Sequence, residues 1–387
     1  MKRVNFFNTF EISVPIWNWL FPYLKNKNIQ PYSILSSGKY RKEKKSSIHE
    51  FTKWVWIPFF LKNKKIVNHL FYFFFSPYYL LFNKADLNVF YTQPPFALPF
   101  LALLSRLTRV PYIVHIMDYH PDLLESSEML GSKNFIYKML DGWYINALKN
   151  AKKVIVLGDC MNQMFLAKGI PSEKIDAIPN ISSIEEFSPP QIDKINTFKA
   201  KHGAQNKLTI LYAGNMGVAH EFRTILEVSK HFEDTIQFFF VGKGARRKEV
   251  ETFVEDKKTN NITLLGYLAN DVFEIVLQSA DMHFISLRDG FEGIMVPSKL
   301  YSSLAIGKPI LFEGNKQSEV ARVIEKFNCG LYVPHLNQEK MIDQLNRLIQ
   351  EKENIKGLGA NARDSYISHF HSSVFCEKYL QTIQTSS

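Results

Sequence analysis

The second half of the chain alternates short apolar runs with amphipathic segments. The apolar runs predict buried strands, and apolar residues at helical spacing between them predict helices. The expected strands cover 208–214, 235–242, 261–266, 281–287, 309–314 and 330–334, and the expected helices cover 220–232, 246–257, 271–280, 297–306, 318–327 and 339–351. Such close alternation predicts a parallel, doubly wound α/β sheet, which binds its ligands beyond the carboxyl ends of the strands.

The first half of the chain is less regular. Its expected strands are 87–91, 112–117 and 153–157, and its expected helices are 96–107 and 141–150. The stretch 66–82 is the nearest to a membrane span, but it is short and Pro77 interrupts it, so we expect a peripheral or buried segment. A linker is expected over 181–191, where Pro189-Pro190 stands among serines.

Length and composition fit two globular domains. With 387 residues and 46% hydrophobic content, the chain builds a large core without disulfides. Its cysteines, Cys160, Cys329 and Cys376, are odd in number, widely spaced and without a C-x-x-C pair. This pattern indicates a reducing compartment and buried, apolar thiols.

Part of the formal charge of +10 lies beside aromatic residues. The basic run 41–45 and Lys62, Lys64 and Lys65 stand close to Trp54, Trp56, Phe59, Phe60 and the aromatic run 71–75. This combination predicts attraction to an anionic membrane surface. Nucleic acid is not expected as a partner, because no helix-turn-helix, zinc-finger or stacking motif is present. No cleavable apolar core follows Met1, so we expect a cytoplasmic protein, peripheral on the inner face of the cell membrane.

Three apolar runs reach glycine or proline where a helix is expected to begin: 208–217, 238–247 and 293–309. Backbone N–H groups and the positive helix end at such a turn favour a phosphate. Arg247 and Lys299 are expected to reach a diphosphate at the same edge, which predicts a sugar-nucleotide site. Gly214 and Gly217 suit either a simple turn or the close approach of a ligand.

Four motifs, taken in order, resemble those of a known family. Ile178-Pro-Asn180 stands before Phe187 and Pro189, and the segments 214–217, 241–247 and 305–309 follow with matching spacing. The chain resembles the retaining GT-B glycosyltransferases of family 4. The phrases at 115–121 and 296–301 are most similar to the subgroup that builds bacterial capsule, O-antigen and colanic-acid polysaccharide. The resemblance covers most of the chain and is weakest before Asp86.

The resemblance implies a GT-B fold, in which two doubly wound Rossmann-like domains face each other across a cleft. We expect an N-terminal, acceptor-side domain over 1–185 and a C-terminal, nucleotide-sugar-binding domain over 186–370. A C-terminal helix is expected within 371–387, packed back on the first domain.

The chain departs from the family at one point. The family commonly carries paired glutamates at a fixed spacing, the second lying shortly after the lysine of the Pro-x-Lys phrase. Here Ser302 occupies the second position and Ile294 the first, while Glu292 is nearby but out of register. The ribose contact of the second glutamate therefore has no counterpart at Ser302.

The resemblance also implies roles for individual residues. Lys299 and Arg247 are expected to stabilise the negative charge that grows on the diphosphate as the glycosidic bond breaks. Asp118 and His120 are expected to take the acceptor's proton or bind sugar hydroxyls, although Asp118 also suits a turn cap. The expected nucleotide-sugar-binding residues are Gly214, Asn215, Gly217, Gly242, Gly244, Arg246, Glu292, Gly293, Ile294, Val296, Pro297, Ser298, Tyr301 and Ser302. No Asp-x-Asp sequence occurs, so neither a metal nor a separate cofactor is expected.

The expected function is transfer of a sugar, with retention, from a nucleotide donor to a lipid-linked saccharide in bacterial surface-polysaccharide biosynthesis. The expected donor is a UDP-linked N-acetylhexosamine or a deoxy derivative, and the expected acceptor is linked to polyprenyl diphosphate. Two alternatives stay open. A nucleotide-sugar epimerase or hydrolase of the same fold needs an acid–base carboxylate cluster, for which the chain offers only scattered candidates. A non-catalytic binding protein is compatible with the missing glutamates.

Overall fold

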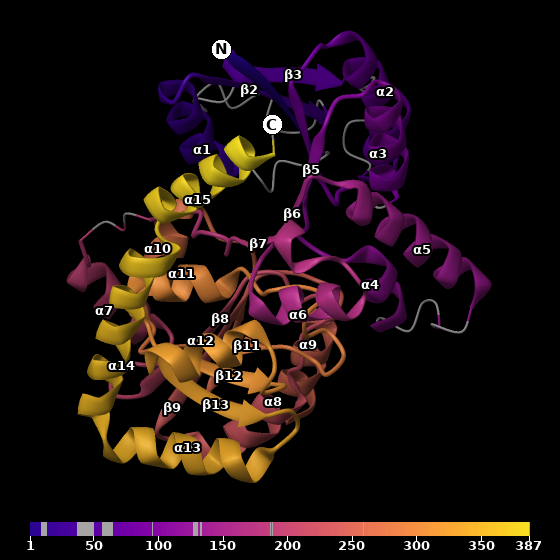
Figure 1. The fold of residues 1–387 in the computed structure, drawn as a ribbon. Helices are drawn as coiled ribbons and strands as arrows, with labels where there is room; N and C mark the ends of the chain where they lie inside the picture. The colour runs from indigo at the N-terminus through magenta and orange to yellow at the C-terminus, as the bar shows by residue number, and fades with distance from the viewer. Residues whose placement is uncertain are drawn as a thin grey trace. The chain divides into compact units, whose positions relative to one another are not determined.

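The computed structural model contains two compact α/β units, each built on a parallel sheet (Figure 1). It describes residues 1–8, 14–36, 50–55, 65–94, 96–126, 131, 134–185, 187, 189–257 and 259–386. The first unit contains Met1–Ser183, Gly293–Val296 and Ser372–Ser387, and the second contains Ile184–Glu292 and Pro297–His371. The predicted doubly wound α/β class is confirmed.

The sheet of the first unit has the strand order β3-β2-β1-β4-β5-β6-β7, and its neighbouring strands are parallel. The strands are β1 (Lys2–Phe7), β2 (Ile29–Ser36), β3 (Thr52–Val55), β4 (Leu87–Tyr91), β5 (Tyr112–His115), β6 (Lys153–Val156) and β7 (Ile175–Ala177). The helices are α1 (Val14–Asn26), α2 (Lys65–Phe82), α3 (Ala97–Leu107), α4 (His120–Ser126), α5 (Phe135–Asn150), α6 (Asp159–Ala167), a 3₁₀ turn at Ser172–Lys174, and α15 (Ser372–Thr385).

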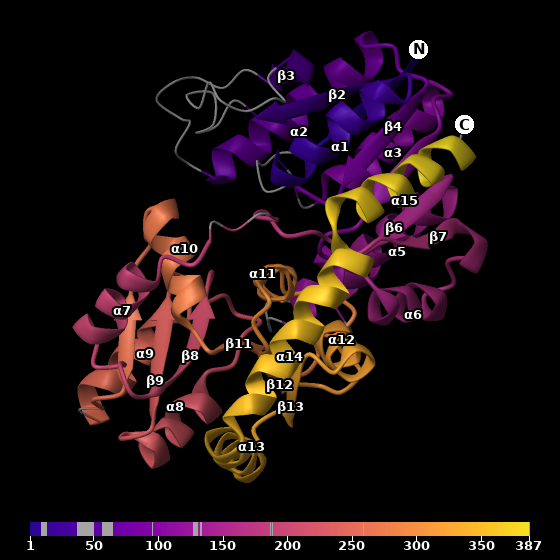
Figure 2. The same ribbon diagram turned by 90° about the vertical axis from the view of Figure 1, so that its left-hand side faces the viewer.

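Alternating side chains of this first sheet enter two different cores. Phe6 packs against Trp17 of α1 and Tyr379 of α15. The next residue, Phe7, points to the opposite face and packs against Phe90, beneath α2 and α3. Figures 1 and 2 show α15, in yellow, lying beside α1. The carboxyl-terminal helix thus completes the core of the first unit.

The sheet of the second unit has the order β10-β9-β8-β11-β12-β13, again parallel throughout. The strands are β8 (Leu208–Ala213), β9 (Ile236–Val241), β10 (Ile262–Leu265), β11 (Met282–Ser286), β12 (Ile310–Gly314) and β13 (Gly330–Pro334). The helices are α7 (Ile192–Lys201), α8 (Arg223–Ser229) with a 3₁₀ turn at Lys230–Phe232, α9 (Arg247–Lys257), α10 (Asn270–Ser279), α11 (Lys299–Ile306), α12 (Glu319–Phe327), α13 (Gln338–Gln350), α14 (Lys352–Ser365) and a π-helical turn at Tyr366–Phe370.

This second sheet also separates two cores. Phe240 packs against Phe222 and Tyr212 on one face. Phe239 points to the other face and packs against Phe198 of α7. Because the strands are parallel, their carboxyl ends share one edge, and the loops that follow them gather there.

The stretch 66–82 forms the amphipathic helix α2, in which Tyr72 is fully buried while Phe74 and Phe82 are more than 70% exposed. Among the described residues, no helix combines the length and apolarity needed to cross a bilayer. Of the predicted membrane-facing residues, 41–45, Trp56, Phe59, Phe60, Lys62 and Lys64 lie outside the described ranges. The cysteines are free and buried, as predicted.

Candidate active site

The loops after β8 and β9 touch each other through their glycines. Gly214 and Gly242 have φ values of 128° and 134°, which side chains rarely tolerate. A Cβ on Gly242 would lie 2.1 Å from the carbonyl oxygen of Gly214, and one on Gly244 would lie 2.4 Å from that of Met216. At Gly217 a Cβ would meet the Asn215 side chain at 3.0 Å. These glycines therefore join two loops backbone to backbone.

Lys299 is the first residue of α11 and extends over the loop after β8. Its Nζ lies 3.1 Å from His220 Nε2, 3.5 Å from the Asn215 carbonyl oxygen and 4.6 Å from the centre of the Tyr212 ring. Burial lowers the pKa of Lys299 to about 7. The lysine is thus a fixed cation whose charge is sensitive to pH near neutrality.

His220 supports this lysine. Its Nδ1 lies 2.7 Å from the carbonyl oxygen of Ser286, and since a carbonyl only accepts, Nδ1 carries the proton. Nε2 is therefore left with a lone pair and accepts a hydrogen bond from Lys299. Burial, together with the charge of Lys299, lowers the pKa of His220 to about 3, so the ring is neutral. The sequence analysis did not single out His220. The only mark of this residue in the sequence is that it is polar and lies between Gly217 and the helix.

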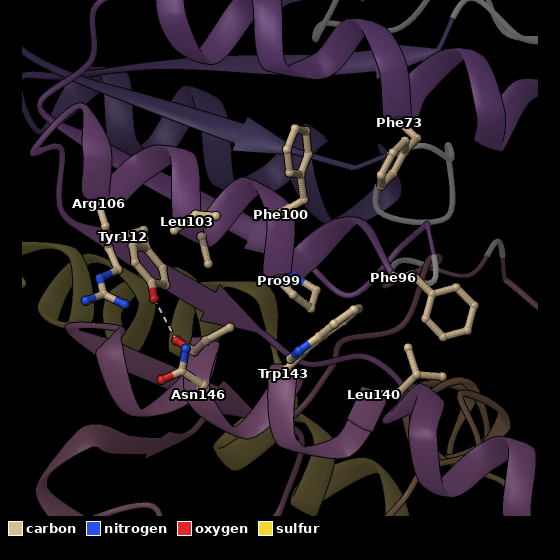
Figure 3. A pocket seen from close by; sticks show the side chains of 12 residues that line it. Phe73, Phe96, Pro99, Phe100, Leu103, Arg106, Tyr112, Leu140, Trp143 and Asn146 are labelled. Carbon is tan, nitrogen blue, oxygen red and sulfur yellow. Dashed lines mark hydrogen bonds between the residues drawn. The ribbon is translucent and has the colours of Figure 1, made fainter. Parts of the chain in front are cut away.

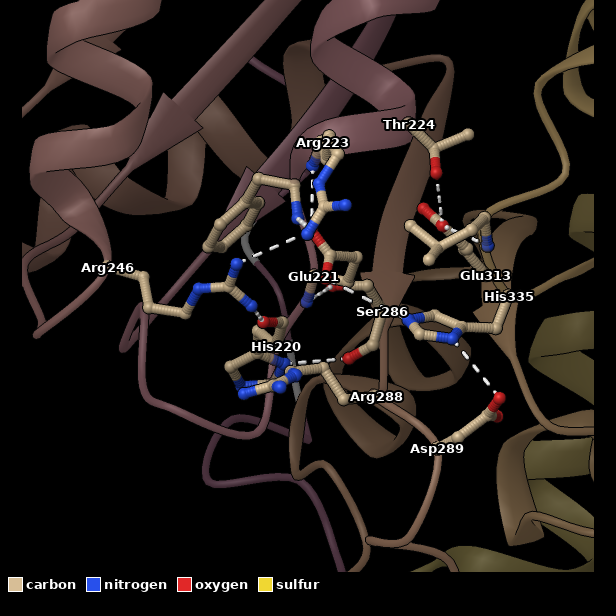
Figure 4. A network of polar contacts seen from close by, with 12 residues as sticks. His220, Glu221, Arg223, Thr224, Arg246, Ser286, Arg288, Asp289, Glu313 and His335 are labelled. Carbon is tan, nitrogen blue, oxygen red and sulfur yellow. Dashed lines mark hydrogen bonds and ion pairs between the residues drawn. The ribbon is translucent and has the colours of Figure 1, made fainter. Parts of the chain in front are cut away.

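The two arginines at the start of α9 are held by protein groups. The Arg246 guanidinium forms a paired contact with Glu249 at 2.6 and 2.7 Å. It also donates to the His220 carbonyl, as Figure 4 shows. Arg247 donates to the carbonyls of Gly242 and Leu265 at 2.6 and 2.8 Å and contacts Glu251. Arg247 thus braces the loop after β9, and Arg246 ties the start of α9 to the loop after β8. The catalytic role predicted for Arg247 stays a prediction.

A network of buried carboxylates begins at Glu221, next to His220, and is drawn in Figure 4. Glu221 accepts from the backbone N–H groups of Phe222 and Arg223 at 3.0 and 2.9 Å, which satisfies the N–H of the first residue of α8. Burial opposes ionisation of this group, but the Arg223 N–H and the Arg246 charge lower the pKa of Glu221 overall. Glu313, at the end of β12, accepts from Thr224 at 2.6 Å and from the Leu336 N–H at 3.1 Å. Burial raises the pKa of Glu313 to about 7.

The remaining predicted binding residues of the second unit make local contacts. Glu292 accepts from the Gly290 N–H at 2.8 Å and from Asn315 at 3.2 Å. Ser302 donates to the Lys299 carbonyl at 3.1 Å, and Tyr301 is buried against Phe370. Pro297 is buried and Ser298 is exposed, directly before α11.

Gly293, Ile294 and Val296 belong to the first unit. The Ile294 carbonyl accepts from the Tyr119 N–H at 3.0 Å, and Met295 forms an antiparallel bridge with Asp118. A Cβ on Gly293 would lie 3.3 Å from the Cys160 carbonyl oxygen. The segment is thus held by its own backbone contacts to the loop after β5.

Asp118 and His120 lie together where β5 passes into α4. Burial raises the pKa of Asp118 to about 6 and lowers that of His120 to about 4, although a backbone contact with Thr92 partly offsets the latter. The Asp118 carboxylate makes no hydrogen bond or ion pair with any described residue, and His120 Nε2 is buried without a partner there. His120 is therefore neutral near pH 7, and Asp118 has the pKa of a general base.

The described part of the chain contains no group of three or more His, Cys, Asp or Glu side chains arranged to hold a metal ion.

Comparison with known proteins identifies the second unit. Residues 207–351 match the family described as glycosyl transferases group 1. This stretch is a glycosyl transferases group 1 domain. The chain is 23% identical over 236 residues to the putative colanic acid biosynthesis glycosyl transferase WcaI of Escherichia coli, covering 60% of this chain and 58% of WcaI. It is 23% identical over 310 residues to the probable glycosyltransferase WbjE of Pseudomonas aeruginosa, covering 78% of this chain and 75% of WbjE.

Solved structures confirm the GT-B architecture of this glycosyltransferase domain and its companion unit. Anabaena HepE in complex with UDP superimposes with a TM-score of 0.75 at 14% identity, covering 100% of both chains. WaaG, a glycosyltransferase involved in lipopolysaccharide biosynthesis, superimposes with a TM-score of 0.67 at 15% identity, covering 99% of this chain and 100% of that one.

Proposed function

We propose that the chain transfers a sugar from a UDP-linked donor to a lipid-linked saccharide, without a metal and with retention of configuration. The observation that carries the proposal is the Lys299–His220 pair, fixed at the start of α11 within the glycosyl transferases group 1 domain. UDP and UDP-glucose are bound by the similarly folded HepE, which supports UDP as the nucleotide. WcaI, named for colanic acid biosynthesis, supports a polysaccharide acceptor.

In the proposed reaction the bond between the anomeric carbon and the diphosphate oxygen breaks, and UDP leaves with its negative charge. Lys299 would stabilise that charge, because an ammonium held in place costs no reorganisation when the charge develops. His220 is a positioning residue, since its lone pair holds Nζ in place while its own ring stays neutral.

The acceptor hydroxyl supplies the oxygen of the new glycosidic bond and must lose its proton. Asp118 is the proposed base, because it is largely ionised at pH 7 and has no partner among the described residues. Retention follows if the acceptor attacks from the face that UDP leaves, so no carboxylate nucleophile is needed. This last step rests on the family resemblance.

The proposed lipid-linked acceptor places the enzyme at a membrane surface. The helix α2 carries Phe74, Tyr78 and Phe82 on its outside, each more than half exposed. Aromatic residues on an amphipathic helix favour the interfacial region of a bilayer. We therefore propose peripheral attachment at the inner face of the cell membrane through the first unit.

The experiment is thermal unfolding of the purified chain with UDP, GDP, ADP or CMP and no added metal. A ligand that binds the folded state raises the midpoint by mass action. We expect a shift with UDP that exceeds the others and that is reduced in Lys299→Ala. Equal shifts with all nucleotides would remove the UDP assignment, and no shift with any would favour a non-catalytic binding protein.

A further inference from the structure

The first unit contains an open cavity of about 480 Å³ between α2, α3 and α5 (Figure 3). Its walls are mainly aromatic and aliphatic, and the largest contributors are Phe73, Phe96, Phe100, Leu103 and Trp143. The rings of Phe73 and Phe100 stack at 5.5 Å and join α2 to α3. A cavity of this size and lining has the properties of a site for a small apolar ligand.

The two ends of the cavity differ in polarity. Figure 3 shows the Arg106 guanidinium, the Tyr112 hydroxyl and the Asn146 amide at one end, and Phe73 and Phe96 at the other. The Tyr112 hydroxyl donates to the Ala147 carbonyl at 2.7 Å. The Arg106 guanidinium makes no hydrogen bond or ion pair with any described residue. The cavity therefore has one cationic end and one apolar end, which matches a ligand with an anionic head and a hydrocarbon chain.

The surface around the cavity has the same character. The sequences of α2 and α3 contain no Asp or Glu, so Arg106 has no acidic neighbour on its own helix or on α2. Large apolar side chains are exposed on these helices, with Phe74 at 71%, Phe82 at 72% and Leu107 at 71%. Exposed apolar surface beside a cavity is typical of a region that meets a membrane or a ligand.

We propose that this cavity holds the hydrocarbon chain of a phosphate-bearing lipid, with Arg106 at the phosphate. The proposal deepens the proposed function, on which it rests, by giving the lipid of the acceptor a binding site. The chain lies along Leu103 and Trp143 toward Phe96, and the unpaired guanidinium meets the anion at the other end. A lipid supplies both parts at once, whereas a free phosphate leaves the apolar walls unused.

The test is a titration with farnesyl phosphate at concentrations below those at which it aggregates. Binding is monitored by the change in tryptophan emission. Trp143 lines the cavity, so a saturable change that disappears in Trp143→Phe reports binding there. We expect geranyl phosphate, which is shorter, to bind at least about tenfold more weakly, since each buried methylene contributes roughly fourfold. Farnesol is expected to bind more weakly than farnesyl phosphate, and Arg106→Gln should remove that difference.

A matched pair of variants distinguishes binding in the cavity from nonspecific adsorption to exposed apolar side chains. Leu103 and Leu107 both lie on α3 and are 50% and 71% exposed, but only Leu103 lines the cavity. Leu103→Asp should weaken farnesyl phosphate binding at least about tenfold, while Leu107→Asp, with the same charge change, should leave it nearly unchanged. Because both leucine side chains are exposed, both variants should fold. The thermal shift induced by UDP checks the folding of each variant in the same samples.

Three outcomes overturn the proposal: no saturable binding, equal loss in the two variants, or a dimer of the chain that Leu103→Asp dissociates. The last would mean that a second copy covers the cavity. If UDP still stabilises the protein while farnesyl phosphate does not bind, the lipid site is wrong and the proposed function stands. If neither binds, the proposed function itself fails.

Discussion

The two units treat their polar groups differently. In the second unit the charged side chains at the ends of the strands are paired, Arg246 with Glu249 and Arg247 with Glu251. In the first unit the Asp118 carboxylate and His120 Nε2 have no partner among the described residues. Buried polar groups are normally hydrogen-bonded, so the unmet ones indicate where a polar ligand is expected. At these strand ends, the second unit presents paired charges, and the first presents polar groups without a partner in the described part of the chain.

The units also differ in their surfaces. The helices α2, α3 and α5 of the first unit expose a cluster of large aromatic and aliphatic side chains. The helices of the second unit expose isolated ones such as Ile192 and Val272. Scattered exposed apolar residues are ordinary, whereas a cluster indicates an interaction surface. This difference agrees with the proposal that the first unit meets the acceptor and the membrane and that the second meets the nucleotide.

Replacing Lys299 tests the prearranged cation and should have the largest effect. In Lys299→Ala the growing charge on the diphosphate loses its ammonium, and we expect turnover to fall by roughly 10²- to 10³-fold. The measurement is the rate of UDP release with donor and acceptor at saturation. Lys299→Arg keeps the charge and should retain more activity than the alanine variant.

The control for this change is Lys316→Ala. Lys316 belongs to the same unit but is 69% exposed and makes only a loose contact of 3.7 Å with Glu325. Its replacement should leave turnover within about twofold, because exposed ion pairs contribute little. If both lysines affected turnover equally, a general electrostatic effect would replace the specific role of Lys299.

Replacing Asp118 tests the unpaired groups of the first unit. Asp118→Asn removes the proposed base, and we expect kcat/KM to fall by about 10²-fold. In the unchanged chain, kcat/KM should rise with pH through about 6, as the Asp118 carboxyl loses its proton. It should fall again above about 7, as Lys299 loses its charge.

The two limbs of this profile have separate controls. Asp118→Asn should lose only the acid limb, and Lys299→Arg should lose only the alkaline limb, since the guanidinium stays charged. An acid limb that persists in Asp118→Asn would assign the base to another residue and weaken the contrast between the units.

Sequence patterns captured the second unit well and the first unit poorly. The strand expected at 330–334 matches β13, and the other strands of that sheet differ by a residue or two at their ends. Long apolar runs are the clearest signal for buried parallel strands. In the first unit Pro31 lies within β2 and Pro22 within α1, and prolines at such positions argue against either element. The helix predicted from 141 begins at Phe135 instead, where Asn134 caps it.

The candidate site was predictable only in part. The sequence singled out the glycines and Lys299 as candidates, because their spacing is local in the sequence. His220 was not, because its partners Ser286 and Lys299 lie 66 and 79 positions away, and only folding brings them together. The pairing of Arg247 with backbone carbonyls was equally invisible, since backbone acceptors leave no mark on the sequence.

The smallest expected effect concerns a buried carboxyl of the second unit that departs from the contrast between the units. Glu313 lies in the second unit, yet its Oε2 is buried without a partner among the described residues. Burial raises the pKa of this carboxyl to about 7 from 4.5. The protonated form is therefore favoured in the folded state, and its contribution to stability, complete below about pH 4.5, is lost as the pH rises through about 7.

Glu313→Gln removes this titration while keeping an oxygen to accept from Thr224 and the Leu336 N–H. The new amide changes the free energy of unfolding by an amount that does not depend on pH. The informative quantity is therefore how the difference in free energy of unfolding between the variant and the unchanged chain varies with pH. From pH 5 to pH 8 the free energy of unfolding of the variant should rise by about 2 kcal/mol relative to that of the unchanged chain. This estimate follows because each unit of pKa shift corresponds to about 1.4 kcal/mol. Denaturant unfolding at both pH values measures this difference. A constant difference would show that Glu313 is ionised throughout, and then an unrecognised cation must compensate it inside the second unit.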